Sequence, residues 1–162
     1  MQESQLRFVR QLGYSVPASD ALYEALMLQP RIIGCLVLLG AWFQSAWLFL
    51  ALSGVLWLAA VVPTWNVFDA IYNTFIAHPR ALQRLDAAPA PRRFAMGMAG
   101  TLALVIGAAL LAGATTTAWI LEGLFAAAVV AVVFGRSCAG AVVYHSLRRR
   151  LSTAPQSVPT RV

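Results

Sequence analysis

Two long apolar tracts dominate the chain. They cover residues 32–63 and 94–135, and Glu122 is the only charged residue within them. A helix needs about 20 predominantly apolar residues to cross the hydrocarbon core of a bilayer. Each tract is too long for one comfortable span and slightly short for two, so the length alone predicts membrane-spanning helices without settling their number.

Each tract has a polar break near its middle. Gln44 and Ser45 interrupt the first tract between two tryptophans, and residues 113–119 interrupt the second, where three threonines precede Trp119. Tryptophan is enriched at the interface between membrane and water. The breaks therefore predict two tight hairpins, each made of two helices.

The arginines determine the expected topology. Eleven of the twelve lie in three short segments that flank the tracts, at residues 1–31, 80–93 and 148–161. Cytoplasmic loops carry an excess of basic residues, and only two spans per tract place all three segments in the cytoplasm. We therefore expect an all-α membrane protein of four transmembrane helices, with both termini cytoplasmic. The expected spans are residues 31–45, 47–65, 94–112 and 118–145.

Polar segments are expected outside a transmembrane domain that covers residues 31–146. Residues 1–30 should be a cytoplasmic or interfacial segment with a short amphipathic helix over 19–28, and residues 66–93 should connect the hairpins. A helical extension of the second span should end before a proline, at His78. Residues 147–162 form a basic tail whose proline, serine and threonine content predicts disorder.

Composition agrees with lipid as the solvent of this chain. It is 60% hydrophobic and only 11% charged, with a net charge of +6, whereas soluble domains carry about a quarter charged residues. Since no separate polar domain accompanies the arginines, we expect them to face anionic lipid headgroups, not nucleic acid. Nothing in the sequence requires a cofactor, and its cofactor content stays unknown.

Small residues recur at helical spacing in the second tract. Such stripes let helix backbones approach closely, so we expect the third and fourth spans to form the tightest pair. They also suggest a membrane-protein partner or self-association, although alanine used only as apolar filler is the alternative. The stripes are Ala99, Ala103 and Gly107 in the third span, and Ala127, Ala131, Gly135 and Ala139 in the fourth.

Charged residues near the ends of spans are candidates for function, because burying them is costly. Asp69 follows the second span and Arg136 follows the apolar part of the fourth, so one hypothesis is an ion pair between them. The other is that each reaches headgroups separately. Glu122, near the outer end of the fourth span, is expected to reach water at the interface, with a functional carboxylate as the alternative.

Cys35 and Cys138 are the two cysteines, and the topology places both near the cytoplasmic side. They are the weak candidates for catalysis, because a thiol pair is possible but stable disulfides are rare in that compartment. A small buried apolar residue is the simpler interpretation. A metal site of Cys35, Cys138 and His145 has no sequence signature, and haem ligation by His78 and His145 lacks an attachment motif.

Several short motifs carry a family resemblance. They are Pro30-Arg31, Asn66-Val67-Phe68-Asp69, Pro91-Arg92-Arg93-Phe94-Ala95, and Gly135-Arg136-Ser137-Cys138-Ala139-Gly140 followed by Tyr144. In these motifs the chain resembles the bacterial membrane family DUF4395. The resemblance covers residues 28–150 and implies a small four-span protein of unknown function. Many members carry Cys-x-Gly-Cys where this chain has Cys138, Gly140 and Ala141, so a dithiol within the motif is not possible and only Cys138 is carried over.

The leading hypothesis is a bacterial inner-membrane protein that is a non-enzymatic accessory or scaffolding subunit of a larger complex. The sequence contains no P-loop, GxSxG or HExxH motif. The first alternative is a membrane thiol or sulfur redox protein that uses Cys138, with Cys35 as a possible partner. The second is a small transporter in which Asp69 and Arg136 gate a cytoplasmic cavity.

Overall fold

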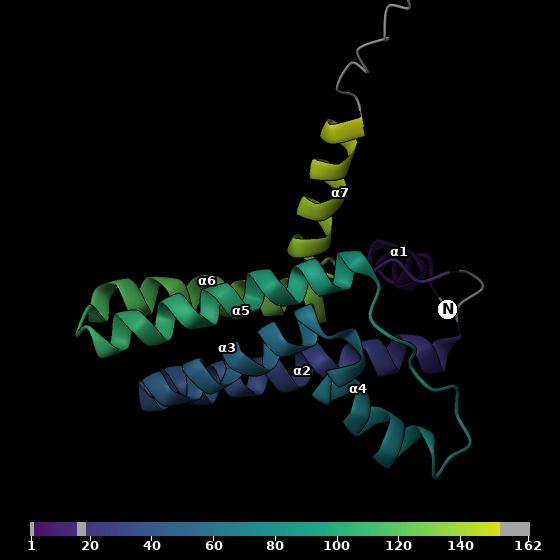
Figure 1. Ribbon diagram of the computed structural model, residues 1–162, viewed down its shortest axis with the longest axis horizontal. Coiled ribbons are helices and arrows are strands. Elements are labelled where there is room, and N and C mark those ends of the chain that lie inside the picture. The colour runs from purple at the N-terminus through teal and green to yellow at the C-terminus, as the bar shows by residue number, and fades with distance from the viewer. Residues whose placement is uncertain (1, 16–18, 153–162) are drawn as a thin grey trace, which may run out of the picture.

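The computed structural model describes residues 2–15 and 19–152, and every regular element in these ranges is helical. Four long helices lie side by side as two hairpins (Figure 1): α2 (Asp20–Phe43) with α3 (Ala46–Val61), and α5 (Ala90–Leu111) with α6 (Thr115–Val133). The all-α prediction is therefore confirmed. The shorter elements are α1 (Glu3–Gln11), η1 (Pro63–Trp65), α4 (Val67–Ile71), η2 (Tyr72–Ala77, a stretch of π-helix) and α7 (Ala139–Ser152).

Three of the long helices are long and apolar enough to cross a membrane. They are α2, α5 and α6, with mean hydropathies between 1.7 and 2.1 over their most apolar windows. The other long helix, α3, contains no charged residue but has only 16 residues. The helices thus have the character of membrane spans, and a crossing by α3 stays a prediction.

Both hairpin turns lie where the polar breaks predicted them. Gln44 ends α2 in the left-handed conformation, with a φ of 47°, and Ser45 caps α3 by accepting a hydrogen bond from the backbone of Leu48. Gly113 follows α5 with a φ of 70°, a conformation that glycine adopts without steric cost. Side-chain capping and a left-handed residue are common ways to end helices.

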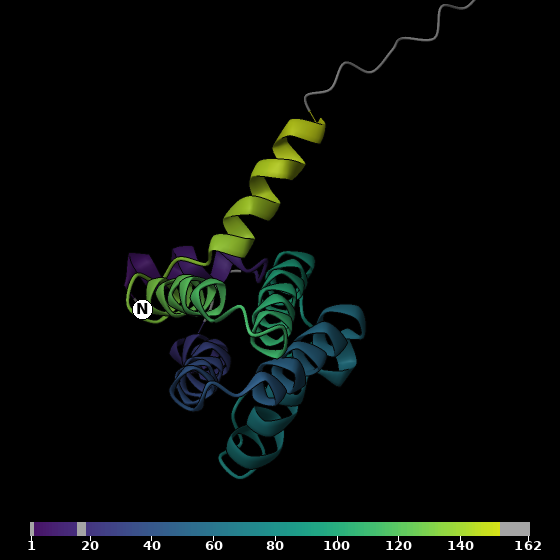
Figure 2. The same ribbon diagram turned by 90° about the vertical axis from the view of Figure 1, so that its left-hand side faces the viewer.

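The two hairpins face each other, with α3 along α5 and α2 along α6 (Figure 2). The pair of α3 and α5 is the most extensive, because glycines remove side chains from its interface. A Cβ atom on Gly107 would lie 2.8 Å from Leu50, and one on Gly100 would lie 2.9 Å from Trp57. The prediction that the third and fourth spans form the tightest pair was therefore wrong.

The two small-residue stripes have different surroundings. In α5, Ala103 and Gly107 are buried and Ala99 is half-buried, so this stripe does pack within the chain. The second stripe faces outward, and its use in self-association stays a prediction. Its exposed members are Ala127, Ala131, Gly135 and Ala139.

The expected fourth span over residues 118–145 is broken. Arg136 adopts a φ of 52°, and the backbone N–H of Ser137 donates to the carbonyl of Ala131 at 3.3 Å, a bond typical of helix ends. After this break, α7 points away from the hairpins (Figure 1). Residues 147–152, expected in the disordered tail, are helical, and residues 153–162 lie outside the described ranges.

The N-terminal segment also differs from expectation. No separate helix covers residues 19–28, because α2 begins at Asp20 and continues through Pro30. Its apolar face is buried within the chain, where Tyr23 and Leu26 pack with Phe8 of α1.

The connection between the hairpins begins with a change of direction. Pro63 starts η1 directly after α3, and the side chain of Asn66 then caps α4 by accepting from the backbone N–H of Phe68 at 3.1 Å. The second span therefore does not extend as one straight helix. The predicted stop is confirmed, since η2 ends at Ala77, immediately before His78.

Candidate functional site

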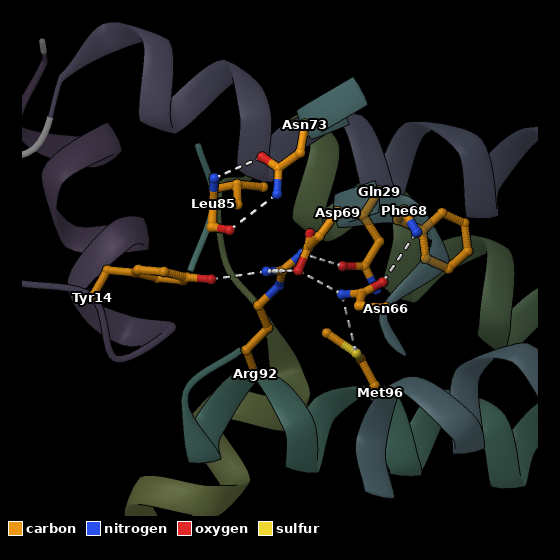
Figure 3. A network of polar contacts seen from close by, with 9 residues as sticks. All are labelled: Tyr14, Gln29, Asn66, Phe68, Asp69, Asn73, Leu85, Arg92 and Met96. Carbon is orange, nitrogen blue, oxygen red and sulfur yellow. Dashed lines mark hydrogen bonds and ion pairs between the residues drawn. The ribbon is translucent and has the colours of Figure 1, made fainter. Parts of the chain in front are cut away.

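A buried ion pair lies at the end of the hairpins opposite their turns. Arg92, in the first turn of α5, donates from both terminal nitrogens to the carboxylate of Asp69 on α4, at 2.5 and 2.9 Å (Figure 3). Arg92 is 4% exposed and Asp69 is 7% exposed. Bidentate hydrogen bonds between charged groups are strong. Either charge without its partner would destabilise the fold, because both side chains are buried.

Three further side chains complete the Arg92 network, which we define as Tyr14, Gln29, Asn66, Asp69 and Arg92. Arg92 donates to the hydroxyl of Tyr14 at 2.8 Å and to Oε1 of Gln29 at 2.6 Å, while Asn66 donates to Asp69 at 2.8 Å (Figure 3). Within the described residues, no fully buried side-chain nitrogen or oxygen of this network lacks a partner. The network joins the segment after α1 to α2, α4 and α5.

Asp69 and Arg92 each lie in the first turn of a helix. Asn66 caps α4, and Asp69 lies in the first turn of α4, where the helix dipole favours a negative charge. Pro91 occupies the start of α5, a position that suits its fixed φ. Arg92 next to it lies at the unfavourable end of the dipole of α5, so Asp69 offsets a cost that the position of Arg92 creates.

Tyr14 serves the network as a neutral group. Burial raises the pKa of the Tyr14 hydroxyl, and this effect outweighs the lowering by the guanidinium of Arg92. At neutral pH, Tyr14 therefore accepts a hydrogen bond from Arg92 without carrying a charge. The charged members of the network are Arg92 and Asp69, and their charges cancel.

A second polar contact anchors the connection between the hairpins. The side chain of Asn73 donates to the backbone carbonyl of Leu85 at 3.1 Å and accepts from the backbone N–H of Leu85 at 2.8 Å (Figure 3). Two bonds to one peptide position hold the loop before α5 against η2. The chain therefore enters α5, which carries Arg92 in its first turn, from a fixed direction.

The break between α6 and α7 rests on α1. Arg136 donates to Oε1 of Gln2 at 2.6 Å and to the hydroxyl of Ser4 at 2.5 Å, and its guanidinium lies 5.9 Å from the ring centre of Tyr23. The partners of Arg136 in α1 are neutral. Arg136 thus fastens the N-terminal helix to the end of α6.

The expected ion pair between Asp69 and Arg136 was therefore wrong. Asp69 has Arg92 as its partner, and Arg136 has α1. From the sequence, Arg92 was expected to face lipid headgroups like the other arginines of the connection. The overlooked signal is its place directly after Pro91 at the start of an apolar helix, where the side chain is held close to the neighbouring helices.

Cys138 lies in the same break and is held by its backbone. The side chain of Gln11 accepts from its N–H at 3.2 Å and donates to its carbonyl at 3.3 Å. Burial raises the pKa of the Cys138 thiol, and a protonated thiol is a poor nucleophile. Cys35 lies exposed on α2, and both cysteines are free.

Neither a thiol pair nor a metal centre emerges from these positions. His145 lies with its Nε2 3.0 Å from the carbonyl oxygen of Gln11, so this ring too connects α7 to α1. Among residues 2–15 and 19–152, no group of three or more His, Cys, Asp or Glu side chains is placed to hold a metal ion. The break is therefore a docking point for α1 and α7.

The segments that carry the sequence motifs meet at this end of the molecule. A Cβ atom on Gly140 would lie 2.7 Å from the backbone of Ala95, so α7 starts in direct contact with α5. Nearby, the rings of Phe94 and Tyr144 lie 5.8 Å apart. The motif at the start of α5 therefore contacts the motif at the start of α7 and, through Arg92, the motif of α4.

An apolar groove of about 1080 Å³ runs beside α5 next to this region. It is lined by residues of α1, α2, α3, α5, α6 and α7, and the lining includes Gln29 and Arg92. Small residues such as Gly97, Ala99 and Ala128 contribute to its walls. Such a groove can accept an apolar chain or the side of an apolar helix.

The opposite end of the hairpins contains one further buried acidic side chain. Glu122 on α6 is 2% exposed and accepts a hydrogen bond from Nε2 of Gln44 at 3.0 Å. The expectation that Glu122 reaches water was wrong, because the hairpin turn of Gln44 covers it.

Comparison with known proteins gives one match. The model of a family described as a domain of unknown function, DUF4395, matches residues 25–149. No curated protein and no solved structure matches the chain significantly. The matched region contains both hairpins, the break at Cys138 and every member of the Arg92 network except Tyr14.

Proposed function

This chain belongs to the DUF4395 family, and we propose that it is a four-span protein of the bacterial inner membrane. Its helices α2, α3, α5 and α6 would form a four-helix bundle with both termini in the cytoplasm. In this proposal, the protein is a non-enzymatic scaffolding subunit of a larger membrane complex.

The surface of the long helices supports a lipid environment. Large apolar side chains are exposed on all four of them, and soluble monomers rarely expose such extended apolar surface. Examples, one from each helix, are Leu38 at 64%, Trp57 at 42%, Leu104 at 47% and Leu124 at 58% exposure.

The length of α3 is the weak point of a four-span topology, and its ends supply support. At about 1.5 Å per residue, α3 is about 24 Å long, less than a hydrocarbon core of about 30 Å. Trp47 at its start and Trp65 in η1 are 74% and 67% exposed, as interfacial anchors would be. Local thinning of the bilayer would accommodate the remaining difference.

The positions of charge support the proposed orientation. The hairpin turns lie at one end of the molecule, while α1, α7 and the connection before α5 lie at the other (Figure 1). The arginines of residues 80–93 and 148–150 belong to the second end. A cytoplasmic location of that end agrees with the positive-inside rule.

The observation that carries the scaffolding role is the closure of the Arg92 network. Its ion pair, amide groups and hydroxyl group bind one another, and these bonds stabilise four chain segments. No acid, base or nucleophile of the network is left poised for reaction. The thiol alternative requires Cys138 to ionise, and its raised pKa opposes this. The transporter alternative loses the pair of Asp69 and Arg136 on which it was based.

The groove beside α5 gives the complex a contact surface, and we place an apolar helix of the partner there. Met98 lies on the rim and is 42% exposed, whereas Leu124 is 58% exposed on α6 outside the groove. A photo-reactive amino acid at position 98, introduced into the tagged chain in its native membrane, should form a discrete adduct with another protein. The same group at position 124 is the control.

The outcome separates the alternatives. A protein adduct from position 98 that is absent from position 124, and that co-purifies with the chain in mild detergent, supports the scaffolding role. Adducts with lipid alone, together with migration of the chain as a lone monomer, would contradict it.

A further inference from the structure

The contact between Glu122 and Gln44 bridges the two hairpins at the end that bears their turns. Glu122 lies in the second turn of α6, and Gln44 is the left-handed residue that ends α2. Nε2 of Gln44 donates both to Oε2 of Glu122 at 3.0 Å and to the carbonyl of Ala41 at 2.8 Å. The amide therefore has a fixed orientation, with its nitrogen turned toward the carboxyl group.

Each of the two side chains has one oxygen without a partner. Oε1 of Glu122 and Oε1 of Gln44 are both buried, and neither has a hydrogen-bond partner within the described residues. Buried polar atoms are normally paired, and an unmade hydrogen bond in the interior is costly. Both atoms are acceptors if Glu122 is ionised, so they cannot satisfy each other in that state.

No counter-charge compensates an ionised Glu122. The sequence of α3 contains no ionisable side chain, and α5 contains none after Arg93, about 27 Å along the helix from its outer end. On α2 the nearest ionisable group is Cys35, about 13 Å along the helix from Gln44. Glu122 is the only ionisable residue of α6. A buried carboxylate without a cation is strongly disfavoured.

We propose that Glu122 is a proton-binding site. One proton on Oε1 turns this atom into a donor, and Oε1 of Gln44 is the acceptor that lacks one. Together with the bond from Nε2 of Gln44 to Oε2, this completes a cyclic acid–amide pair. The single proton gives both oxygens a partner, removes the buried charge and closes the two hairpins against each other. The site is independent of any partner protein.

Infrared spectroscopy of the membrane-reconstituted chain tests this directly. The difference between the wild type and Glu122→Gln should contain the carbonyl band of a protonated carboxylic acid at neutral pH. Glutamine puts an amide in place of the carboxyl group, and this amide can still pair with Gln44, so the fold should be preserved. Glu24→Gln is the matched control: it removes an exposed carboxyl group that pairs with Arg31, so the acid band should remain.

Dicyclohexylcarbodiimide provides a second readout. The acid adds across a C=N bond of this apolar reagent: the carboxyl oxygen bonds to the central carbon, the proton moves to nitrogen, and rearrangement gives a stable N-acylurea. Peptide mapping should find the label on Glu122 and not on Asp69.

Two results would overturn the proposal. One is a carboxylate band, with no acid band, assigned to Glu122 at neutral pH. The other is protection of Glu122 from labelling by sodium salts but not by choline salts, which would assign the two free oxygens to a bound metal cation. An acid band without labelling would support the proton site and show that the reagent does not reach it.

Discussion

Replacing Arg92 with leucine removes one half of the buried ion pair while keeping an apolar stem at the start of α5. Asp69 would remain 7% exposed in the wild-type packing, with Asn66 as its remaining donor. Gln29 and Tyr14 would also lose the guanidinium that they accept from. The substitution therefore leaves an uncompensated charge at the point where four segments meet.

The expected cost follows from this geometry. Breaking a buried ion pair by removing one partner destabilises proteins by about 3–5 kcal/mol. For a chain of this size, that corresponds to a lower Tm by about 6–20 °C. The exposed pair of Arg31 and Glu24, at 3.0 Å with side-chain exposures of 52% and 59%, is the matched control. Arg31→Leu should change stability by no more than about 1 kcal/mol.

Unfolding in mixed micelles with increasing sodium dodecyl sulfate, followed by circular dichroism, measures the difference. Asp69→Leu and the double variant complete a thermodynamic cycle with Arg92→Leu. Because the double variant leaves no unpaired charge, its loss should be smaller than the sum of the single losses by about 0.5–3 kcal/mol. Equal stability of Arg92→Leu and the wild type, or strict additivity in the cycle, would refute the reasoning.

Three further predictions follow from single positions. Gly140→Val should push α7 from α5 and destabilise the chain by about 1–3 kcal/mol, whereas Gly123→Ala, which meets no atom within 4 Å, should be neutral or stabilising in the same unfolding assay. Asn73→Ala should free the loop at Leu85 and speed its cleavage by added protease, and unchanged cleavage would contradict that anchor. Cys138 should react with iodoacetamide more slowly than in the unfolded chain up to well above its ordinary pKa of about 8.5, since burial raises that pKa. By the same linkage, the stability that the neutral thiol contributes is present below the ordinary pKa and is lost as pH rises through the folded-state pKa; equal alkylation rates would contradict this.

The helices and turns could be predicted because they depend on local pattern. The near absence of charge over residues 32–63 and 94–135, where Glu122 is the single exception, predicted the long helices. The polar pair Gln44 and Ser45 predicted a turn that the structure contains. The break after α6 was missed because it depends on the left-handed backbone conformation of Arg136. The residue types in this segment do not predict that conformation.

The site was harder to predict because its partners are distant in sequence. Asp69 was recognised as a buried charge in need of a partner, but Arg92 and Arg136 were equally available by charge. The choice between them depends on how α4 turns after Pro63, which is a property of the tertiary packing. The contact between Gln44 and Glu122 could not be predicted for the same reason, because the two residues meet only when the hairpins pack against each other.

The central claim is that both hairpins cross the bilayer completely, with α3 as a true span. Reporters of location fused after residue 80 and at the C-terminus, with others inserted at the turns near residues 44 and 113, test it most directly. The account predicts that the first two lie in the cytoplasm and the two turns lie outside. A reporter after residue 80 on the opposite side from the C-terminus would contradict it.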